Sequence, residues 1–295
     1  MIQRTNGEKI FNVFNYILLA LIGAVTLYPF LYTLSISVST QAEAEKIGLH
    51  LLPNFQQITW TPYKMVFQNA EIWNAYKYTL FRTIVGTLLS LLVTCFYGYA
   101  LSRPGLPMKK FFTAFIMFTM LFSGGQIPTY LNMKSLGLIN SVWVYILPTL
   151  IAAYNVIVSK SFFATLPESL NESAKIDGAG EFRIFFQIIV PLSKPIIMTL
   201  ALWNAVAHWN EWYSGMMYIT DQRKIVVQNY IQRIINEGNT NLITDKNLAG
   251  QAEEQATPKT IQSASIMVSM LPILVVYPFI QKYFVKGVTL GAVKG

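Results

Sequence analysis

One strongly apolar stretch of this sequence carries a group of polar and aromatic side chains that could hold a polar solute. Residues 202–215 read LWNAVAHWNEWYSG, which is the composition of a helix at membrane depth. Ionisable and amide groups in such a helix usually face a cavity or a partner helix, because exposing them to lipid is costly. Hydrogen bonding between helices, or an aromatic belt at the outer membrane edge, would explain the same residues equally well. The candidate residues of this stretch are Asn204, His208, Trp209, Asn210, Glu211 and Trp212.

Two further apolar stretches contain residues that raise similar questions. Tyr154 and Asn155 are candidates for the same polar path, and Pro148 just before them is expected to loosen their helix because proline lacks a backbone donor. In the preceding apolar stretch, Gly124 and Gly125 favour close helix packing over a bend.

No residue set typical of catalysis or of a resident metal is evident in the sequence. The only histidines are His50 and His208, which are too few for a clustered metal site. The single cysteine, Cys95, can form no intramolecular disulfide. No nucleophile with an evident base appears, and the phosphate-binding pattern G-x-x-x-x-G-K-[ST] does not occur. A membrane-embedded enzyme is therefore not expected, and any ATP chemistry would belong to another subunit.

A charged, amphipathic segment interrupts the apolar sequence at residues 172–191, which read ESAKIDGAGEFRIFFQIIVP. We predict a helix that begins at a capping box formed by Thr165 and Glu168. It should end at Gly178, where a residue able to adopt a positive φ is preferred. A second short helix should follow and be closed by the prolines at 191 and 195. One side of that helix is lined by Phe182, Phe185, Phe186 and Ile189.

The composition predicts a membrane protein. Of the 295 residues, 53% are hydrophobic and only 12% are charged, and the mean hydropathy is +0.42. Soluble domains carry about a quarter charged residues, so this chain has too little polar surface for a water-exposed globule.

The fold class expected is an all-α integral membrane protein, with one transmembrane domain over residues 1–295. A bilayer core needs about 20 apolar residues per helix. The first apolar run lacks a small-residue cleavage site, so we interpret it as a retained helix. The long connections are 40–77 and 218–260. The six expected spans are about 11–37, 78–101, 111–131, 142–163, 196–217 and 261–284.

The basic residues predict the orientation of the spans. Arg and Lys gather before the first span, in the 102–110 connection and after the last span. By the positive-inside rule both termini are cytoplasmic, and so is the loop 165–195 between spans four and five. The net charge of +8 is explained by anionic lipid near these flanks, so no nucleic-acid partner is expected.

The segment at 172–191 resembles a known family. Its pattern E-S-A-(three)-G-(nine)-I-x-V-P is similar to the EAA loop of permease subunits in binding-protein-dependent ABC importers, with Ser173 in place of alanine and Val190 in place of leucine. Asp177, Ala179 and Pro195 are similar to the maltose-transporter type, the carbohydrate-uptake branch. The stretches 128–141 (PTYLNMKSLGLINS), 209–212 (WNEW) and 277–295 (YPFIQKYFVKGVTLGAVKG) resemble importers of complex oligosaccharides, including alginate and aldouronate types.

The resemblance implies the role of the loop and the partners of the chain. In that family the loop is a coupling helix that docks into a cytoplasmic ATPase subunit. The partners implied are a homologous second permease, two copies of the ATPase and an external sugar-binding protein, in a bacterial cell membrane. ATP and Mg²⁺ would be bound by the ATPase, with no cofactor in this chain. The coupling residues implied are Glu172, Ser173, Ala174, Asp177, Gly178 and Ala179, of which Ala174 and Gly178 would permit close approach of the ATPase.

The resemblance implies that the solute is a sugar, and specifically an oligosaccharide. Sugars favour aromatic faces flanked by amide and carboxylate groups, so Trp209, Asn210, Glu211 and Trp212 are candidates to line its path. In maltose-type systems, however, the tight sugar contacts lie mainly in the other permease subunit. An ABC permease for a non-sugar solute is an alternative. An ion-coupled secondary transporter is a further one, although it should carry more intramembrane charge than Glu211 and His208.

Overall fold

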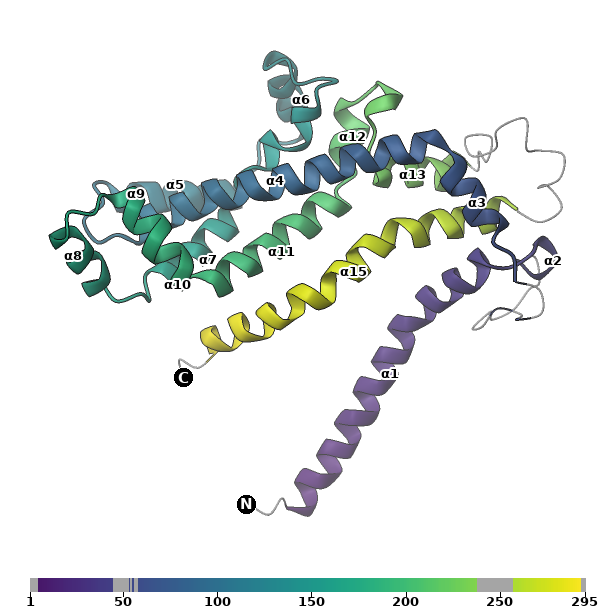
Figure 1. Ribbon diagram of the computed structural model, residues 1–295, viewed down its shortest axis with the longest axis horizontal. Helices are drawn as coiled ribbons and strands as arrows, with labels where there is room; N and C mark the ends of the chain where they lie inside the picture. Colours follow the sequence, from purple (N-terminus) through teal and green to yellow (C-terminus); the bar gives the residue numbers. More distant parts are fainter. Residues whose placement is uncertain (1–4, 45–52, 54, 56–57, 238–256, 293–295) are drawn as a thin grey trace. The chain divides into compact units, whose positions relative to one another are not determined.

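The computed structural model describes residues 5–44, 53, 55, 58–237 and 257–292, and within them the chain is helical, with a single isolated β-bridge between Ser39 and Ile58 and no strand. The predicted all-α class is thereby confirmed. The helices, drawn in Figure 1, are α1 (Asn6–Ser37), α2 (Gln41–Ala44), α3 (Thr61–Gln68), α4 (Ala70–Ser102), α5 (Lys109–Leu121), α6 (Gln126–Ser135), η1 (Val142–Tyr145), η2 (Leu147–Thr149), α7 (Ala153–Phe163), α8 (Ser169–Ile176), α9 (Glu181–Ile184), the π-helix η3 (Phe185–Ile189), α10 (Val190–Leu192), α11 (Lys194–Asn210), α12 (Tyr213–Tyr218), η4 (Gln222–Lys224), α13 (Val227–Glu237) and α15 (Pro258–Ala292).

The chain divides into two compact units. The first comprises Met1–Ile72 and Ile231–Leu271, and the second comprises Trp73–Tyr230 and Pro272–Gly295. The candidate coupling segment and all eight candidate path residues belong to the second unit, so the description of the site concerns that unit alone.

Several helices are long and apolar enough to cross a membrane. Three qualify alone, namely α1, α4 and the Pro258–Val276 part of α15. Three further helix pairs qualify together but are bent, by 115° between α5 and α6, by 51° between η1–η2 and α7, and by 85° between α9–α10 and α11. Length and composition therefore allow between three and six spans. The first two bends lie within the expected third and fourth spans. The third bend precedes the expected fifth span, which is broken between α11 and α12.

The bends have local causes in the sequence. Between α5 and α6 the chain is extended at Phe122 and reaches φ +89° at Gly125, a conformation that glycine tolerates. Among the described residues, no atom lies within 4 Å of a Cβ built on Gly124 or Gly125, so the expectation that these glycines mark close packing within this chain was wrong. Pro148 lies in the 3₁₀ turn η2 before α7, which confirms its expected loosening of the helix.

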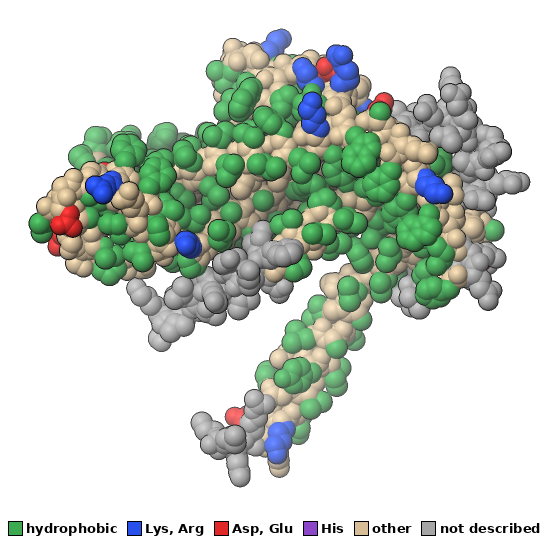
Figure 2. Space-filling model, viewed as in Figure 1, with side chains coloured by type: hydrophobic (Ala, Val, Ile, Leu, Met, Phe, Trp, Pro, Cys, Tyr) green, Lys and Arg blue, Asp and Glu red, His purple; other side chains and the backbone are tan. Residues whose placement is uncertain are grey.

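Helix α4 is the centre of the second unit, and in Figure 1 it runs beside α11. A Cβ atom added to Gly86 would lie 2.6 Å from Nε2 of His208 in α11. One added to Gly98 would lie 2.0 Å from Oγ of Ser159 in α7. Small residues at these two points let the helices approach closely, as is common in membrane bundles. Elsewhere hydrophobic side chains cover much of the visible surface (Figure 2), as a lipid-facing protein requires.

The segment 165–195 folds as two short helices on either side of a glycine turn, as expected. Gly178 adopts φ +75°, its N–H donates to the Lys175 carbonyl, and the Ala179 N–H donates to the Ala174 carbonyl at 2.9 Å. These two bonds form a Schellman motif, which satisfies the terminal carbonyls of α8. The expected capping box is absent at the other end. The Thr165 hydroxyl donates to the Phe162 carbonyl at 2.7 Å, and α8 begins later, after Glu168.

The helix after Gly178 buries fewer aromatic residues than expected. Phe185 and Ile189 are buried, whereas Phe182 is 72% exposed and Phe186 is half-exposed. The π-helix η3 contains one residue more per turn than an α-helix, and it directs Phe185 and Ile189 into the core.

Candidate functional site

A pocket of about 310 Å³ opens among η2, α7 and α11. Four of the eight candidate path residues line it, namely Asn155, Asn204, His208 and Glu211. The remaining lining residues are Thr149, Ala152, Trp203 and Ala207. The structure therefore brings half of the candidate residues together around one cavity.

The polar wall of the pocket is a pair of amides on neighbouring helices. Asn155 Nδ2 of α7 donates to Asn204 Oδ1 of α11 at 3.2 Å. Both side chains are buried, and Nδ2 of Asn204 has no hydrogen-bond partner among the described residues. A buried amide donor without a partner is costly unless water or a solute fills its place. The sequence allowed two explanations for these amides, a hydrogen bond between helices and a position facing a cavity. Both apply, because the Asn155–Asn204 pair joins two helices and also lines the pocket.

The aromatic wall comes from a residue that sequence reasoning missed. Trp203 lines the pocket and packs against Tyr154, with ring centroids 5.8 Å apart. Tyr154 itself does not line the pocket, and supports Trp203 from the side. Trp203 directly precedes Asn204 in the apolar stretch that contains the other candidates, and this position was the signal that the sequence offered.

Glu211 is held by an arginine that the sequence analysis also missed. Arg82 of α4 is fully buried, and its Nη1 lies 3.0 Å from Glu211 Oε2. Its Nη2 donates to the backbone carbonyls of Glu211 at 2.6 Å and of Trp209 at 3.4 Å. The signal was a single arginine within the expected span 78–101, because an ionisable residue at that depth usually has a partner.

The Arg82–Glu211 pair explains why the fifth expected span breaks. Helix α11 ends at Asn210, Glu211 is extended, and α12 begins at Tyr213. The terminal carbonyls of α11 accept from the Arg82 guanidinium, while Glu211 Oε1 accepts from the Ser214 N–H at 2.7 Å. The ion pair thus supplies hydrogen bonds to both helix ends that the break exposes.

The remaining candidates lie away from the pocket. Trp209 is buried against Tyr76, with ring centroids 6.3 Å apart. Asn210 is exposed, and Trp212 is 40% exposed. The Trp212 carbonyl accepts from Asn229 Nδ2 at 2.8 Å. Trp209 thus packs in the core of the second unit, and Trp212 anchors α12 to α13.

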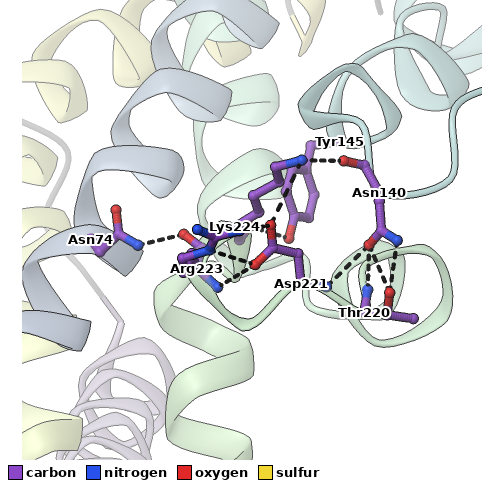
Figure 3. A network of polar contacts seen from close by, with 7 residues as sticks. All are labelled: Asn74, Asn140, Tyr145, Thr220, Asp221, Arg223 and Lys224. Carbon is purple, nitrogen blue, oxygen red and sulfur yellow. Dashed lines mark hydrogen bonds and ion pairs between the residues drawn. The ribbon is translucent and has the colours of Figure 1, made fainter.

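A dense polar network lies beyond α12 (Figure 3). Asn140 has φ +60°, and its Oδ1 accepts from the N–H groups of Thr220 at 2.6 Å and of Asp221 at 3.1 Å. Lys224 Nζ donates to the Asn140 carbonyl at 2.8 Å, and Tyr145 donates its hydroxyl proton to the Lys224 carbonyl at 3.0 Å. The loop that follows α12 is therefore fixed to the segment that precedes η1.

The same network joins the loop to α4. Asn74 Nδ2 donates to the Arg223 carbonyl. Within the loop, hydrogen bonds from the Arg223 side chain and backbone hold the pKa of the Asp221 carboxyl below its ordinary value.

The candidate coupling residues differ in exposure. Glu172, Ser173, Asp177 and Gly178 are exposed, and Ala179 is partly buried. Ala174 is only 6% exposed, because it packs inward against a cluster that includes Cys95, Phe163 and Ile184. It therefore supports the segment from beneath and offers no surface to a partner, contrary to its expected role. Ile176 presents the apolar surface instead, since its side chain is 86% exposed.

The charges of the segment are partly paired. Lys175 Nζ lies 2.7 Å from Glu181 Oε1, across the glycine turn. A hydrogen bond from Lys175 lowers the pKa of the Glu181 carboxyl, while Glu172 and Asp177 are exposed on the outer face. Groups of three or more potential metal ligands do not occur among the described residues.

Comparison with known proteins places the chain in a family. Residues 105–290, which contain the pocket-lining residues and the segment 165–195, match the family described as "Binding-protein-dependent transport system inner membrane component". The chain belongs to this family, and it is a transport subunit with an all-α membrane fold.

Its individual relatives agree over the full length. Protein LplC of Bacillus subtilis is 38% identical, with 99% of this chain and 98% of LplC covered. The polygalacturonan/rhamnogalacturonan transport system permease protein YtcP of the same organism is 37% identical, with 98% and 99% covered. Among solved structures, a chain of a bacterial ABC transporter involved in the import of the acidic polysaccharide alginate matches with a TM-score of 0.88 and 31% identity, over 96% of this chain and 100% of that one.

A second chain shares the fold alone. It comes from a bacterial alginate ABC transporter in complex with an alginate pentasaccharide-bound periplasmic protein, and it matches with a TM-score of 0.55 and 15% identity. The resemblance on which the sequence analysis relied is confirmed by the family match and by these full-length relatives.

Proposed function

We propose that this chain is the permease subunit of an ATP-driven importer, and that it forms half of the translocation path for an oligosaccharide delivered by an external binding protein. The observation that carries the proposal is similarity along nearly the whole chain to YtcP, a permease of a polygalacturonan/rhamnogalacturonan transport system, and to a chain of an alginate importer. The pocket supports it, because an indole ring beside two amides and a carboxylate suits a ligand rich in hydroxyl groups.

The proposed assembly contains a homologous second permease and two copies of a cytoplasmic ATPase. ATP and Mg²⁺ would bind to those ATPase subunits, because the sequence lacks a phosphate-binding loop. When the ATPases close on ATP, their movement would pass through the coupling segment and open the permease cavity outward. Both termini and the segment 165–195 would then be cytoplasmic, and the six spans would include the bent pairs α5–α6 and η1–η2–α7, with α11 in the fifth span.

Within the proposed path, each group of residues that lines the pocket would make a different kind of contact with the sugar. Asn155 and Asn204 would exchange hydrogen bonds with hydroxyl groups, and Trp203 would stack on a sugar face. Glu211 would accept from a hydroxyl while Arg82 balances its charge. We expect Asn204→Leu to weaken uptake several-fold, while Asn210→Leu, a change of the same kind on the same helix away from the pocket, has little effect.

The coupling segment provides the test of the assembly. The variants Gly178→Asp and Glu172→Lys alter exposed residues. No atom of the described residues lies within 4 Å of a Cβ at Gly178, and the φ of +75° costs a non-glycine residue about 1 kcal/mol. Both should insert and fold, yet lose co-purification of the ATPase and uptake in vesicles. The change Ser173→Ala, at an exposed neighbour, should be nearly silent. Normal uptake by both charged variants would reduce the segment to a membrane-surface anchor and overturn the proposal.

The solute is identified through the binding protein. Thermal-shift screening of that protein against fragments of polygalacturonate, alginate and xylan should show stabilisation by one of them. Stabilisation by a non-sugar solute alone would replace the oligosaccharide with that solute and leave the assembly as proposed.

A further inference from the structure

A single hydroxyl group of α4 contacts both helices of the coupling segment. Tyr99 Oη lies 3.2 Å from Asn171 Oδ1 in α8 and 3.1 Å from Glu181 Oε2 at the start of α9. Asn171 is only 3% exposed. The hydroxyl can donate its proton to either oxygen, so it connects the two sides of the Gly178 turn to the end of α4.

An ion pair attaches the beginning of the segment to the same helix end. Arg103, directly after α4, places Nη1 at 3.1 Å and Nη2 at 3.0 Å from the two carboxylate oxygens of Glu168. The guanidinium carbon also lies 5.7 Å from the centre of the Tyr99 ring. Two parallel N–H···O bonds fix the geometry of such a pair more firmly than a single contact would. We refer to Tyr99, Arg103, Glu168, Asn171 and Glu181 together as the clasp.

Apolar packing supports the clasp from beneath. Ala174 of α8 and Phe185 of the π-helix lie in one buried cluster with Cys95 and Tyr99 of α4. The ring of Phe96 stacks on Phe185 with centroids 4.6 Å apart. The coupling segment is therefore bonded and packed to α4 along both of its helices.

The backbone that leads from the coupling segment to α11 is a less direct connection than these contacts with α4. After α9 the chain passes through the π-helix η3 and then turns by 85° at Ser193 before α11 begins. A π-helical turn followed by a sharp bend is typical of a hinge, and transmits a push poorly along its axis. A continuous α-helix does so well, and α4 has 33 residues without a break.

Nearer its middle, α4 is bonded to a residue that lines the pocket. Arg82 bonds Glu211 and the end of α11, and Thr79 Oγ1 accepts from the Val227 N–H at 2.9 Å. The 17 residues from Arg82 to Tyr99 correspond to about 26 Å of helix. One continuous helix thus carries the clasp at its C-terminal end and, near its middle, the arginine that pairs with Glu211 of the pocket.

We propose that α4 transmits the movement of the coupling segment to the pocket, with Tyr99 and Arg82 as positioning residues. This inference rests on the proposed function. Without the Tyr99 hydroxyl, the segment would still dock on the ATPase through its outer face, but its movement would no longer be fixed to α4.

The test is the ratio of sugar transported to ATP hydrolysed by the reconstituted complex. The probe is whichever of polygalacturonate or alginate oligosaccharides stimulates the wild-type complex. Tyr99→Phe removes one oxygen and keeps the ring. It should leave ATPase co-purification unchanged and lower the transport ratio at least threefold. Tyr97→Phe, on the same helix outside the clasp, should leave the ratio unchanged.

A second pair of variants keeps the inference testable if Tyr99→Phe is poorly folded. Glu181→Ala, at a largely exposed position, removes the acceptor and should lower the ratio as Tyr99→Phe does. Glu181→Gln retains an acceptor oxygen for Tyr99 while breaking the Lys175 ion pair, so it should restore most of the ratio.

The outcomes separate the two proposals. A wild-type ratio in both Tyr99→Phe and Glu181→Ala would overturn the role of α4, and so would an equal loss of hydrolysis and transport in complexes that are folded and fully assembled. If Gly178→Asp abolishes uptake in the same assay, the coupling assignment stands whatever the clasp variants show.

Discussion

At the scale of single residues, the most consequential contact is the buried pair of Arg82 and Glu211. Each residue was visible in the sequence, but their pairing depends on how α4 packs against the break between α11 and α12. A guanidinium serves this place because it reaches a carboxylate and two carbonyl oxygens at once.

Removing the arginine alone should therefore destabilise the fold more than removing both charges of the pair. We expect Arg82→Met to leave the Glu211 carboxylate unbalanced, and to cost about 3 kcal/mol of stability. The double variant Arg82→Met with Glu211→Gln should recover part of that loss. Thermal unfolding of the detergent-solubilised chain measures both. A double variant less stable than Arg82→Met alone would show that the charge balance is not what the pair provides.

The contact of Gly86 with His208 allows an equally sharp test. The added methyl of Gly86→Ala would lie 2.6 Å from the imidazole Nε2, so the helices α4 and α11 must separate or the ring must move. We expect a loss of about 1–3 kcal/mol, typical of overpacking. Gly23→Ala, where a Cβ meets no neighbouring atom, is the matched control. Adding His208→Ala to Gly86→Ala should restore stability if the imidazole is the obstacle, and a further loss would refute that explanation.

At the scale of elements, the sequence predicted the glycine turn because its cause is local. Gly178 supplies the positive φ and the Schellman bonds that end α8. The start of α8 and the inward orientation of Ala174 could not be predicted in the same way, because they depend on contacts with α4, far along the chain. The position of the pocket likewise required the Asn155–Asn204 contact between two helices.

The exposed apolar side chain of Ile176 makes α8 suited to docking. It lies between the charged residues Lys175 and Asp177 and is 86% exposed. We expect Ile176→Glu to leave the thermal stability of the chain unchanged, and to reduce co-purification of the ATPase at least tenfold. Leu136→Glu, at a comparably exposed leucine outside the segment, should not affect co-purification. Retention of the ATPase by Ile176→Glu would exclude this side chain from the interface.

At the scale of the whole molecule, composition alone predicted the membrane class, because the fraction of charged residues is a property of the entire chain. The bends within the expected third and fourth spans escaped the hydropathy pattern, since a bent pair of helices and a straight helix have the same average hydropathy. The break of the expected fifth span between α11 and α12 escaped it for the same reason. Residues 238–256 of the long connection 218–260, and residues 293–295 at the end of the chain, lie outside the described residues.

The orientation follows from the basic flanks and can be tested on this chain directly. Cys95 is the only cysteine and is buried, so Cys95→Ala provides a background for single cysteines. In intact cells, a membrane-impermeant thiol reagent should label Gln222→Cys, which lies in the exposed loop after α12. It should reach Gly105→Cys, or a cysteine appended after Gly295, only after the membrane is opened. The reason is that Arg103, Lys109 and Lys110 are expected to retain the connection before α5 on the cytoplasmic side. Labelling of Gly105→Cys in intact cells would place the connection outside. The segment 165–195, which the Arg103–Glu168 pair joins to it, would then lie outside too, where no cytoplasmic ATPase could reach it.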